Sequence, residues 1–453
     1  MVSDEAGLPD SFDVQTGRNL KWSADLGTET HSTPIVAGGR VYIGTNNGQP
    51  RDPKEQGDRG VLMCFDEKNG RFLWQLAAPK REEDPYFDWP KSGIASPVTV
   101  EGSRVYLVSN RGEVLCLRES RASEPDIIWR FDLTSGAGIW SHDAAHSSIL
   151  IHGDYLYLNT GTGVDNTHKR IRAPAAPSLV VLDKHSGRLI ARDGENIAPN
   201  IFHATWSSPS LAQVNGHPLL FFAAGNGIVY AFDPLSRSGP AKQEEGAQTP
   251  PSPPLPFLRK VWQFAFDPAA PKENVHQYNS NRREGPSDFY SMPVFHKGRL
   301  YVAGGGDLWW GKNEAWLKCI DATKTGAITT NALLWSYPLQ KHVLSTPAIH
   351  NGLIFIADCG RMFHCVDLET GKPCWTHEIR GEAWASPLVA DGKVYLGTRS
   401  GTFYVFAAAK TKQVLSTIEL GNPISASATA ANGVLLVATM NHLYAVHKGA
   451  TTP

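Results

Sequence analysis

Residues 345–375 read STPAIHNGLIFIADCGRMFHCVDLETGKPCW, and residues 385–408 read ASPLVADGKVYLGTRSGTFYVFAA. Both stretches begin with a small residue before Pro, pass through Asn-Gly or Asp-Gly, and continue as two short runs rich in Val, Ile, Tyr and Phe. Short apolar runs that alternate with polar residues predict β-strands. The glycine of the Asn-Gly or Asp-Gly step supplies the positive φ of a tight hairpin. Each stretch is therefore predicted to be a meander of antiparallel strands.

The same unit recurs along the chain. Its eight copies start at Ser32, Ala95, Ser147, Ser207, Ser291, Ser345, Ala385 and Ala426. One four-stranded meander has two apolar faces and is not stable alone. Stacking meanders around an axis buries these faces, in rings of roughly four to eight blades. The sequence thus predicts an all-β fold, an eight-bladed β-propeller of four-stranded antiparallel blades.

The two ends of the chain predict how the ring closes. Asn19–Leu26 resembles a fourth strand without the three preceding ones, whereas the last copy ends at Val446 without a fourth strand. Pairing the N-terminal strand with the last three removes two free sheet edges. We expect one propeller domain over residues 19–447, after an N-terminal extension over residues 1–18. Residues 234–260 should form an inserted loop, because the run TPPSPPLPF is too rich in proline to pair as sheet.

Two repeated positions predict the core. A tryptophan marks the fourth strand of six blades, where a large ring fills the widening wedge between blades; these are Trp22, Trp74, Trp129, Trp262, Trp335 and Trp375. A second slot accepts either Cys or Ala, as in Cys64, Cys365 and Ala231. Such a slot requires a small buried side chain, so these cysteines are expected to be buried thiols.

Composition excludes several classes of function. The chain has 43 Lys and Arg against 44 Asp and Glu, a net charge of -1, which gives no electrostatic reason to expect nucleic acid or an anionic membrane as partner. No apolar run approaches the roughly 20 residues of a transmembrane helix. Met1–Asp10 lacks the apolar core of a signal peptide. This start fits both a chain after signal removal and a cytoplasmic chain.

One residue per blade is expected at the mouth of the central channel, where the innermost strands begin. The eight residues are His31, Ile94, His146, Trp206, Tyr290, Leu344, Trp384 and Ser425. Blades four apart face each other, so His31 should oppose Tyr290, His146 should oppose Trp384, and Ile94 should oppose Leu344. Two interpretations stay open: the rings plug the channel as packing, or they wall a small-molecule pocket.

Long connections on the same face add polar residues to this mouth. The predicted ligand-binding residues are His31, Trp140, His203, Trp206, Asp288, Tyr290 and Trp384. Candidate catalytic residues are His142, Asp143 and His146, because imidazole and carboxylate exchange protons near neutral pH. Two carboxylates should lie near three histidines in the sector of the fourth blade and raise their pKa values.

No metal site is predicted from the spacing of these residues. His142 and His146 form H-x-x-x-H, which would direct both rings to one metal on a helix. The segment leads into a strand, so that argument fails. Asp165–His168 reads DNTH and is either a cation site or a polar loop apex.

The runs CFDEKNGRFLW and CVDLETGKPCW, at Cys64–Trp74 and Cys365–Trp375, resemble the repeat of the pyrroloquinoline-quinone (PQQ)-binding-like, or quinoprotein alcohol dehydrogenase-like, β-propellers. The resemblance covers Trp22 to Val446 and includes the repeat's Trp-docking motif. It implies a periplasmic or extracellular protein whose signal peptide has been removed. The family holds PQQ-dependent dehydrogenases and also a lipoprotein scaffold of outer-membrane protein assembly.

The enzymes' motifs are incomplete in this chain. They carry an adjacent Cys-Cys pair over the quinone, which is absent here, and an HD-x-W-D-like stretch, of which residues 142–146, HDAAH, keep only the first two positions. A calcium-binding set cannot be mapped, so PQQ with calcium is not supported by motifs and the cofactor is left unassigned. The scaffold is anchored through an N-terminal lipidated cysteine, whereas the first cysteine here is Cys64.

The function predicted from these observations is binding of a small molecule or carbohydrate at the channel mouth. Two alternatives remain: a PQQ-dependent dehydrogenase, and a protein-assembly scaffold with a protein partner.

Overall fold

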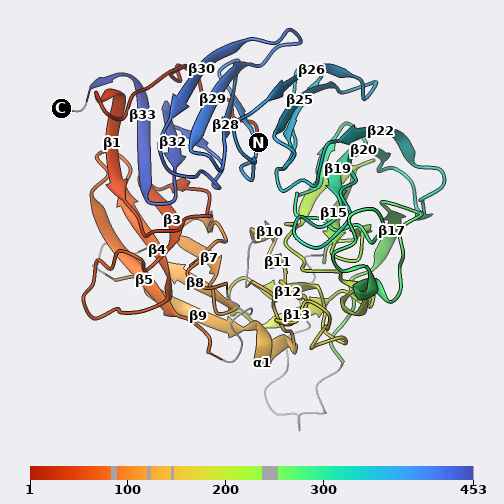
Figure 1. Ribbon diagram of the computed structural model, residues 1–453. Helices are drawn as coiled ribbons and strands as arrows, with labels where there is room; N and C mark the ends of the chain where they lie inside the picture. The colour runs from red at the N-terminus through yellow and green to blue at the C-terminus, as the bar shows by residue number, and fades with distance from the viewer. Residues whose placement is uncertain (83–88, 120–123, 144–146, 237–253, 452–453) are drawn as a thin grey trace.

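The computed structural model describes residues 1–82, 89–119, 124–143, 147–236 and 254–451. Eight sheets stand in a ring around a common centre (Figure 1). Helix in the described residues is limited to α1 (Leu133–Ala137) and the 3₁₀ turns η1 (Ala198–Asn200) and η2 (Val275–Tyr278). The predicted all-β, eight-bladed propeller is therefore confirmed.

Blades 1 to 4 follow one another along the chain, each running from its innermost strand outward. Blade 1 consists of β2 (Ile35–Ala37), β3 (Arg40–Asn46), β4 (Arg59–Asp66) and β5 (Phe72–Pro79). Blade 2 consists of β6 (Thr99–Glu101), β7 (Arg104–Val108), β8 (Glu113–Arg118) and β9 (Asp126–Asp132). Blade 3 consists of β10 (Leu150–His152), β11 (Tyr155–Asn159), β12 (Leu179–Asp183) and β13 (Leu189–Arg192). Blade 4 consists of β14 (Ser210–Val214), β15 (His217–Ala224), β16 (Ile228–Phe232) and β17 (Lys260–Ala265).

Blades 5 to 8 repeat this order. Blade 5 consists of β18 (Val294–His296), β19 (Arg299–Gly305), β20 (Ala315–Asp321) and β22 (Leu333–Leu339). Blade 6 consists of β23 (Ala348–His350), β24 (Leu353–Ala357), β25 (Met362–Asp367) and β26 (Pro373–Glu378). Blade 7 consists of β27 (Leu388–Ala390), β28 (Lys393–Gly397), β29 (Thr402–Ala407) and β30 (Val414–Glu419). Blade 8 consists of β31 (Thr429–Ala431), β32 (Val434–Ala438), β33 (His442–Thr451) and β1 (Arg18–Asp25).

Blade 8 combines both ends of the chain, as the sequence predicts. Strand β1 pairs antiparallel with β33, with Trp22 opposite Ala445. At the end of the pair, the backbone N–H of Gly449 donates to Oδ1 of Asn19 over 2.9 Å. The residues before β1 pack on blade 7: the N–H of Ser3 donates to the carbonyl of Val389, while Leu8 is buried between blades 7 and 8.

Blade 4 departs from the predicted four strands. The short strand β21 (Gly326–Ala327), from the connection between β20 and β22, pairs parallel with β17 at the outer edge of blade 4. Trp262 of β17 lies opposite Gly326 in this pair. The repeat pattern does not predict the addition, because two residues carry no strand periodicity.

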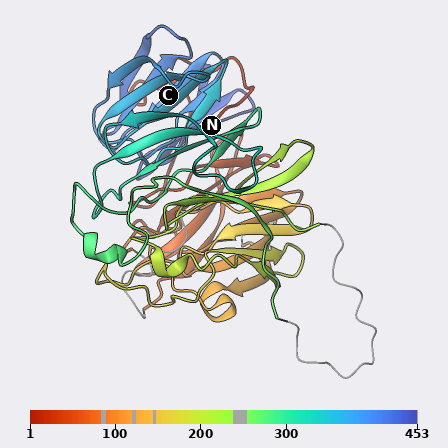
Figure 2. The ribbon, with the colours of Figure 1, turned by 90° about the vertical axis from the view of Figure 1, so that its right-hand side faces the viewer.

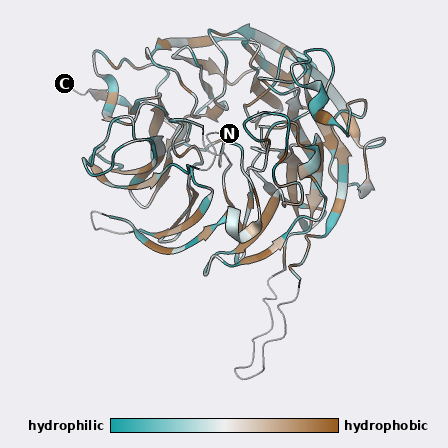
Figure 3. Ribbon diagram, turned by 60° about the horizontal axis from the view of Figure 1, so that its bottom comes forward, coloured by the Kyte–Doolittle hydropathy of each residue, from teal (hydrophilic) through white to brown (hydrophobic). Residues whose placement is uncertain are grey.

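The core lies between the blades, where the apolar faces of neighbouring sheets meet. Tyr42 and Leu62 of blade 1 pack with Val105 and Leu115 of blade 2, all four 1% exposed or less. Full burial of such a side chain is worth roughly 1.5–3 kcal/mol. Figure 3 shows the hydrophobic stretches concentrated on the strands.

In several blades, the tryptophan of the outermost strand contacts the next blade of the ring. The indole N–H of Trp22 in blade 8 donates to the carbonyl of Glu67 in blade 1 over 3.0 Å. Its ring covers Gly70, where a Cβ atom would come within 2.6 Å of the indole. Gly70 has φ of +70°, so this turn requires glycine both for its backbone and for the space.

The connections that precede the innermost strands emerge on one face of the ring, which we call the top face. Figure 2, turned by 90°, shows η1 and η2 on the same side of the ring. The candidate functional site lies on this top face, where these connections converge.

Candidate functional site

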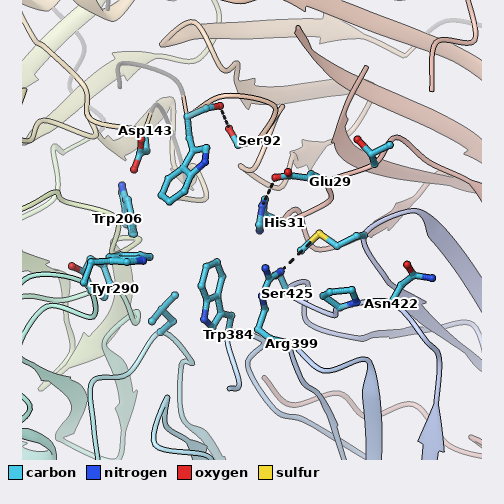
Figure 4. Close-up of a pocket in the computed structure, with 16 residues that line it drawn as sticks. Glu29, His31, Ser92, Asp143, Trp206, Tyr290, Trp384, Arg399, Asn422 and Ser425 are labelled. Carbon is cyan, nitrogen blue, oxygen red and sulfur yellow. Dashed lines mark hydrogen bonds and ion pairs between the residues drawn. The ribbon is translucent and has the colours of Figure 1, made fainter. Parts of the chain in front are cut away.

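A cavity of about 570 Å³ opens on the top face, at the centre of the ring. Its lining comes from the starts of the innermost strands and from the connections beside them: Thr28, Glu29, His31, Trp89, Ser92, Asp143, Trp206, Tyr290, Trp309, Leu344, Trp384, Arg399, Asn422, Pro423, Ser425 and Met440. Figure 4 shows the rings of Trp206, Tyr290, Trp384 and His31 around one open space. The cavity is therefore built by blades on opposite sides of the channel.

The structure brings together six of the eight residues expected at the mouth. These six are His31, Trp206, Tyr290, Leu344, Trp384 and Ser425. Ile94 differs: it is fully buried between blades 1 and 2, and its side chain packs where Gly44 and Gly60 leave room. The expected pair of Ile94 and Leu344 across the channel is therefore wrong. His146 lies outside the described residues.

His31 and Tyr290 lie on opposite sides of the open space in Figure 4, as expected, and each also contacts another ring. His31 stacks on Trp384 with 6.1 Å between ring centroids. Tyr290 contacts Trp206 of the neighbouring blade, at 4.9 Å between centroids. The rings at the mouth therefore contact one another around the perimeter of the cavity.

Trp309 occupies the middle of the mouth and was missed by sequence reasoning. Its ring centroid lies 5.6 Å from that of Trp206 and 6.1 Å from that of Trp384. Both contacts are edge-to-face, a favourable geometry for aromatic rings. Trp309 comes from the long connection between β19 and β20, and the run Asp307–Lys312, DLWWGK, is the signal that could have identified it.

One guanidinium group contributes positive charge to this aromatic wall. The guanidinium carbon of Arg399 lies 4.5 Å from the ring centroid of Trp384. Its Nη1 donates to the hydroxyl of Ser425 over 2.6 Å. On the same side, Nε2 of His31 lies 3.7 Å from a carboxylate oxygen of Glu29. The cavity thus combines flat apolar walls with groups of both charges.

Behind Trp206 and Trp309 lies a cluster of buried histidines. Nε2 of His203 lies 3.0 Å from Nε2 of His142. Nδ1 of His142 contacts the carbonyl oxygen of Val164, and Nδ1 of His203 contacts Oδ2 of Asp307, each over 2.9 Å. The half-buried ring of His168 completes the cluster, with centroids 5.1 and 5.4 Å from those of His142 and His203.

The charges of this cluster follow from burial and from Asp307. Burial acts to raise the pKa of Asp307. His203 and the hydrogen bonds that the carboxylate accepts lower it by more, so the pKa lies at about 2. Burial lowers the pKa of His203, but the Asp307 carboxylate raises it above its ordinary value. Burial, and then repulsion from His203, hold the pKa of His142 well below its usual range. The expected rise in histidine pKa therefore occurs at His203 and is reversed at His142.

The predicted ligand-binding residues divide into two groups. His31, Trp206, Tyr290 and Trp384 line the cavity, as does the candidate catalytic residue Asp143. Trp140 is absent from the lining and lies under the guanidinium of Arg172, at 4.0 Å. His203 and Asp288 are buried behind the wall, at 3% and 2% exposure. Burial, and then the nearby Asp307 carboxylate, raise the pKa of Asp288 well above its usual range.

The residues present do not fit the quinone cofactor of the PQQ-dependent dehydrogenases. The sequence contains no adjacent pair of cysteines. The six cysteines are free, and none lines the cavity in the described part of the chain. We therefore derive no redox step for this site.

Comparisons with known proteins point to one family. A family model described as "Outer membrane protein assembly factor BamB" matches residues 10–254 and 313–447. A curated protein of that name from Yersinia pestis is 22% identical over 368 residues, which cover 77% of this chain and 80% of that protein.

Solved structures share the fold at low identity. The crystal structure of BamB from Moraxella catarrhalis superposes with a TM-score of 0.58 at 12% identity, over 95% of this chain and 98% of that one. Sqt1 from Saccharomyces cerevisiae gives 0.59 at 9% identity, over 96% and 100%. The computationally designed protein Ika8 gives 0.57 at 10% identity, over 94% and 99%. In the described residues, no helix has the length and apolar character needed to cross a membrane.

Proposed function

This chain belongs to the family described as outer membrane protein assembly factor BamB, and from this membership and the cavity we propose an extracytoplasmic propeller that binds a small molecule or glycan at its channel mouth. The family's description supports a periplasmic location. The single observation that carries the binding function is the aromatic cavity on the top face, which encloses about 570 Å³. Ligand cavities in proteins have volumes of roughly 300–1,000 Å³.

The walls of the cavity favour a ligand with a flat or ring-shaped body. Trp206, Trp309 and Trp384 approach it from blade 4, blade 5 and blade 7. Indole faces stack on sugar rings and on planar heterocycles while excluding water from them. Because the three rings meet at near-perpendicular angles of 81° and 85°, they leave a bounded slot instead of one flat surface.

Polar groups at one side of the slot would orient the ligand. Arg399 is held against Trp384 and Ser425, so its guanidinium is positioned before a ligand arrives. Guanidinium groups recognise carboxylates and hydroxyl pairs in a defined orientation. We therefore favour ligands that combine a ring with an acidic or hydroxyl-rich edge, such as an acidic sugar.

A binding screen tests this proposal. The purified protein is assayed on an array of neutral and acidic glycans, and by thermal shift with soluble quinones. A stabilising ligand should lose at least about tenfold in affinity with Trp384→Ala, because aromatic anchors dominate such interfaces. Phe257→Ala is the matched control, since Phe257 is 60% exposed and does not line the cavity. Absence of any stabilising compound, or full affinity in both Trp384→Ala and Trp206→Ala, would refute the proposal.

A protein-assembly role is a second candidate, and the family match favours it. Apolar residues at outer blade edges offer a surface for a partner strand: Leu333 and Leu334 on β22 are 44% and 49% exposed. Extended segments bind exposed edge strands by adding to the sheet. Under this role, the protein should retain an unfolded outer-membrane β-barrel protein on a column. Leu334→Ser should weaken that retention, and Trp384→Ala should not.

A further inference from the structure

The histidine cluster behind the cavity wall contains a contact that requires a cation. The carbonyl of Val164 carries no hydrogen, so Nδ1 of His142 must be the donor in their 2.9 Å hydrogen bond. The ionised Asp307 likewise accepts from Nδ1–H of His203. In each neutral ring the remaining nitrogen, Nε2, then carries a lone pair.

These two lone pairs point at each other across 3.0 Å. Two acceptors at this distance repel each other unless positive charge lies between them. That charge is either a proton on one ring or a metal ion bound by both. The remaining ligand atoms around the pair distinguish these two possibilities.

We propose that His142, His168 and His203 bind one divalent transition-metal ion, with Zn²⁺ as the ion best suited to the site. The ligand nitrogens of the three residues all lie within 4.8 Å of one another. Ligand atoms of a tetrahedral Zn²⁺, with bonds of about 2.0–2.2 Å, lie about 3.3–3.6 Å apart. A proton shared by His142 and His203 has no use for a third imidazole, whereas a metal ion does.

Asp143 lies beside His142 but outside the group of three mutually close ligand atoms. Its Oδ2 lies 3.4 Å from Nε2 of His142, so its carboxylate places negative charge beside the proposed ion. Three imidazoles suit Zn²⁺ better than Ca²⁺ or Mg²⁺, which prefer sites made of oxygen atoms. Asp143 and His168 both have φ of 56°, in the left-handed region, and such strain in non-glycine residues concentrates at functional sites.

The outer partners of the cluster are those of a metal site. Metal-binding histidines usually donate their second N–H to a carboxylate or a carbonyl, which fixes the ring and its tautomer. Asp307 does this for His203, and it also accepts hydrogen bonds from the backbone N–H of Trp309, over 3.0 Å, and from the hydroxyl of Tyr290. Trp309, Tyr290 and Asp143 also line the cavity, so the metal site and the cavity share a wall.

The test is metal binding by the whole chain, and it needs no cavity ligand. Protein stripped with a chelator is titrated with Zn²⁺ against a chromophoric competitor, and with Co²⁺, whose visible absorption reports tetrahedral coordination. We expect one ion per chain and a tetrahedral Co²⁺ spectrum. His168→Ala should weaken Zn²⁺ binding at least about tenfold. This variant should fold, because His168 is only half-buried and lies in a connection. Asp307→Asn should weaken binding roughly 10–100-fold, as expected for an outer partner.

His364→Ala provides the matched control. His364 is another buried histidine bonded to a carboxylate, with Nε2 3.0 Å from Oδ2 of Asp358 and Nδ1 3.0 Å from the hydroxyl of Tyr337. Its substitution should leave Zn²⁺ affinity and the Co²⁺ spectrum unchanged. Failure to bind stoichiometric Zn²⁺ or Co²⁺ would overturn the proposal and leave a shared proton as the cation. Zn²⁺ binding of equal affinity in His168→Ala and in the unmodified protein would overturn it as well. Neither result bears on the cavity ligand, so the two proposals fail independently.

Discussion

Replacing Trp22 by alanine should weaken the closure of the ring. Trp22 lies on β1, is 5% exposed, and packs in the core between blades 8 and 1. Truncating a buried tryptophan to alanine costs roughly 3–5 kcal/mol. Of this total, roughly 0.5–1.5 kcal/mol reflects the hydrogen bond from its indole N–H to the carbonyl of Glu67. We therefore expect Trp22→Ala to lose roughly 3–5 kcal/mol of unfolding free energy, and Trp22→Phe to retain more than half of this stabilisation.

Denaturant unfolding followed by far-UV circular dichroism measures both variants. Phe257→Ala is the control for loss of an aromatic ring, because Phe257 is 60% exposed and should change stability by less than about 0.5 kcal/mol. A Trp22→Ala variant with the midpoint and slope of the unmodified protein would refute the reasoning, because it would mean that the closing strand adds nothing to the stability of the ring. Equal losses in Trp22→Ala and Trp22→Phe would refute the division between packing and hydrogen bonding.

Three further predictions address other parts of the ring. Asp267→Asn removes the nearer of two carboxylate partners of the buried Lys312, the other being Glu314, and should cost roughly 3 kcal/mol at neutral pH in denaturant unfolding. Burial raises the pKa of Asp267, but Lys312 lowers it below the ordinary 3.8. The stabilisation by this ion pair is therefore complete above the ordinary value and is lost as the pH falls through the folded-state pKa. The free energy of unfolding of Asp267→Asn should depend less on pH in this acid range, and an unchanged pH dependence would contradict the reasoning. Gly371→Ala should lower the melting temperature more than Gly352→Ala. Both glycines have positive φ, but only at Gly371 would a Cβ atom come within 2.5 Å of an aromatic ring, that of Trp335. Equal losses in melting temperature would show that backbone strain alone matters. Leu8→Ala should cost roughly 2–5 kcal/mol in the same unfolding assay, whereas Val2→Ala, at a position 49% exposed, should cost little; a silent Leu8→Ala would mean that the segment before β1 does not stabilise blades 7 and 8.

The repeat allowed the fold to be predicted from the sequence, because each blade carries the same local sequence signals. These signals are the Asn-Gly and Asp-Gly turns, the alternating strands and the terminal tryptophan, and each depends on neighbours within a few residues. Stacking eight such units around an axis then gives the propeller. The unmatched ends at Asn19 and Val446 likewise predicted the closing pair of β1 and β33, which the structure confirms.

The candidate site was harder to predict because its contacts join residues that are far apart in the sequence. Aligning the innermost strands brought His31, Trp206, Tyr290 and Trp384 together, but the alignment could not show that Ile94 turns into the core. Trp309 enters from a connection of irregular length, where no repeat position applies. His142 and His203 are in contact although they are 61 positions apart, and spacing along the chain carries no information about such a contact.

The union of both chain ends in blade 8 has a consequence for how this protein is made. Gly449 and Asn19, which are hydrogen-bonded, stand 430 residues apart, so the contact carries nearly the greatest sequence separation that the chain allows. Contacts of long separation form slowly, because the loop they close is costly in entropy. Seven blades can assemble as they emerge, but β1 must wait with an open edge until β33 has been synthesised. During that interval the exposed strand is prone to pairing with other chains. A folding chaperone that covers an extended segment near residues 18–25 would therefore be most useful late in synthesis, just before the ring closes.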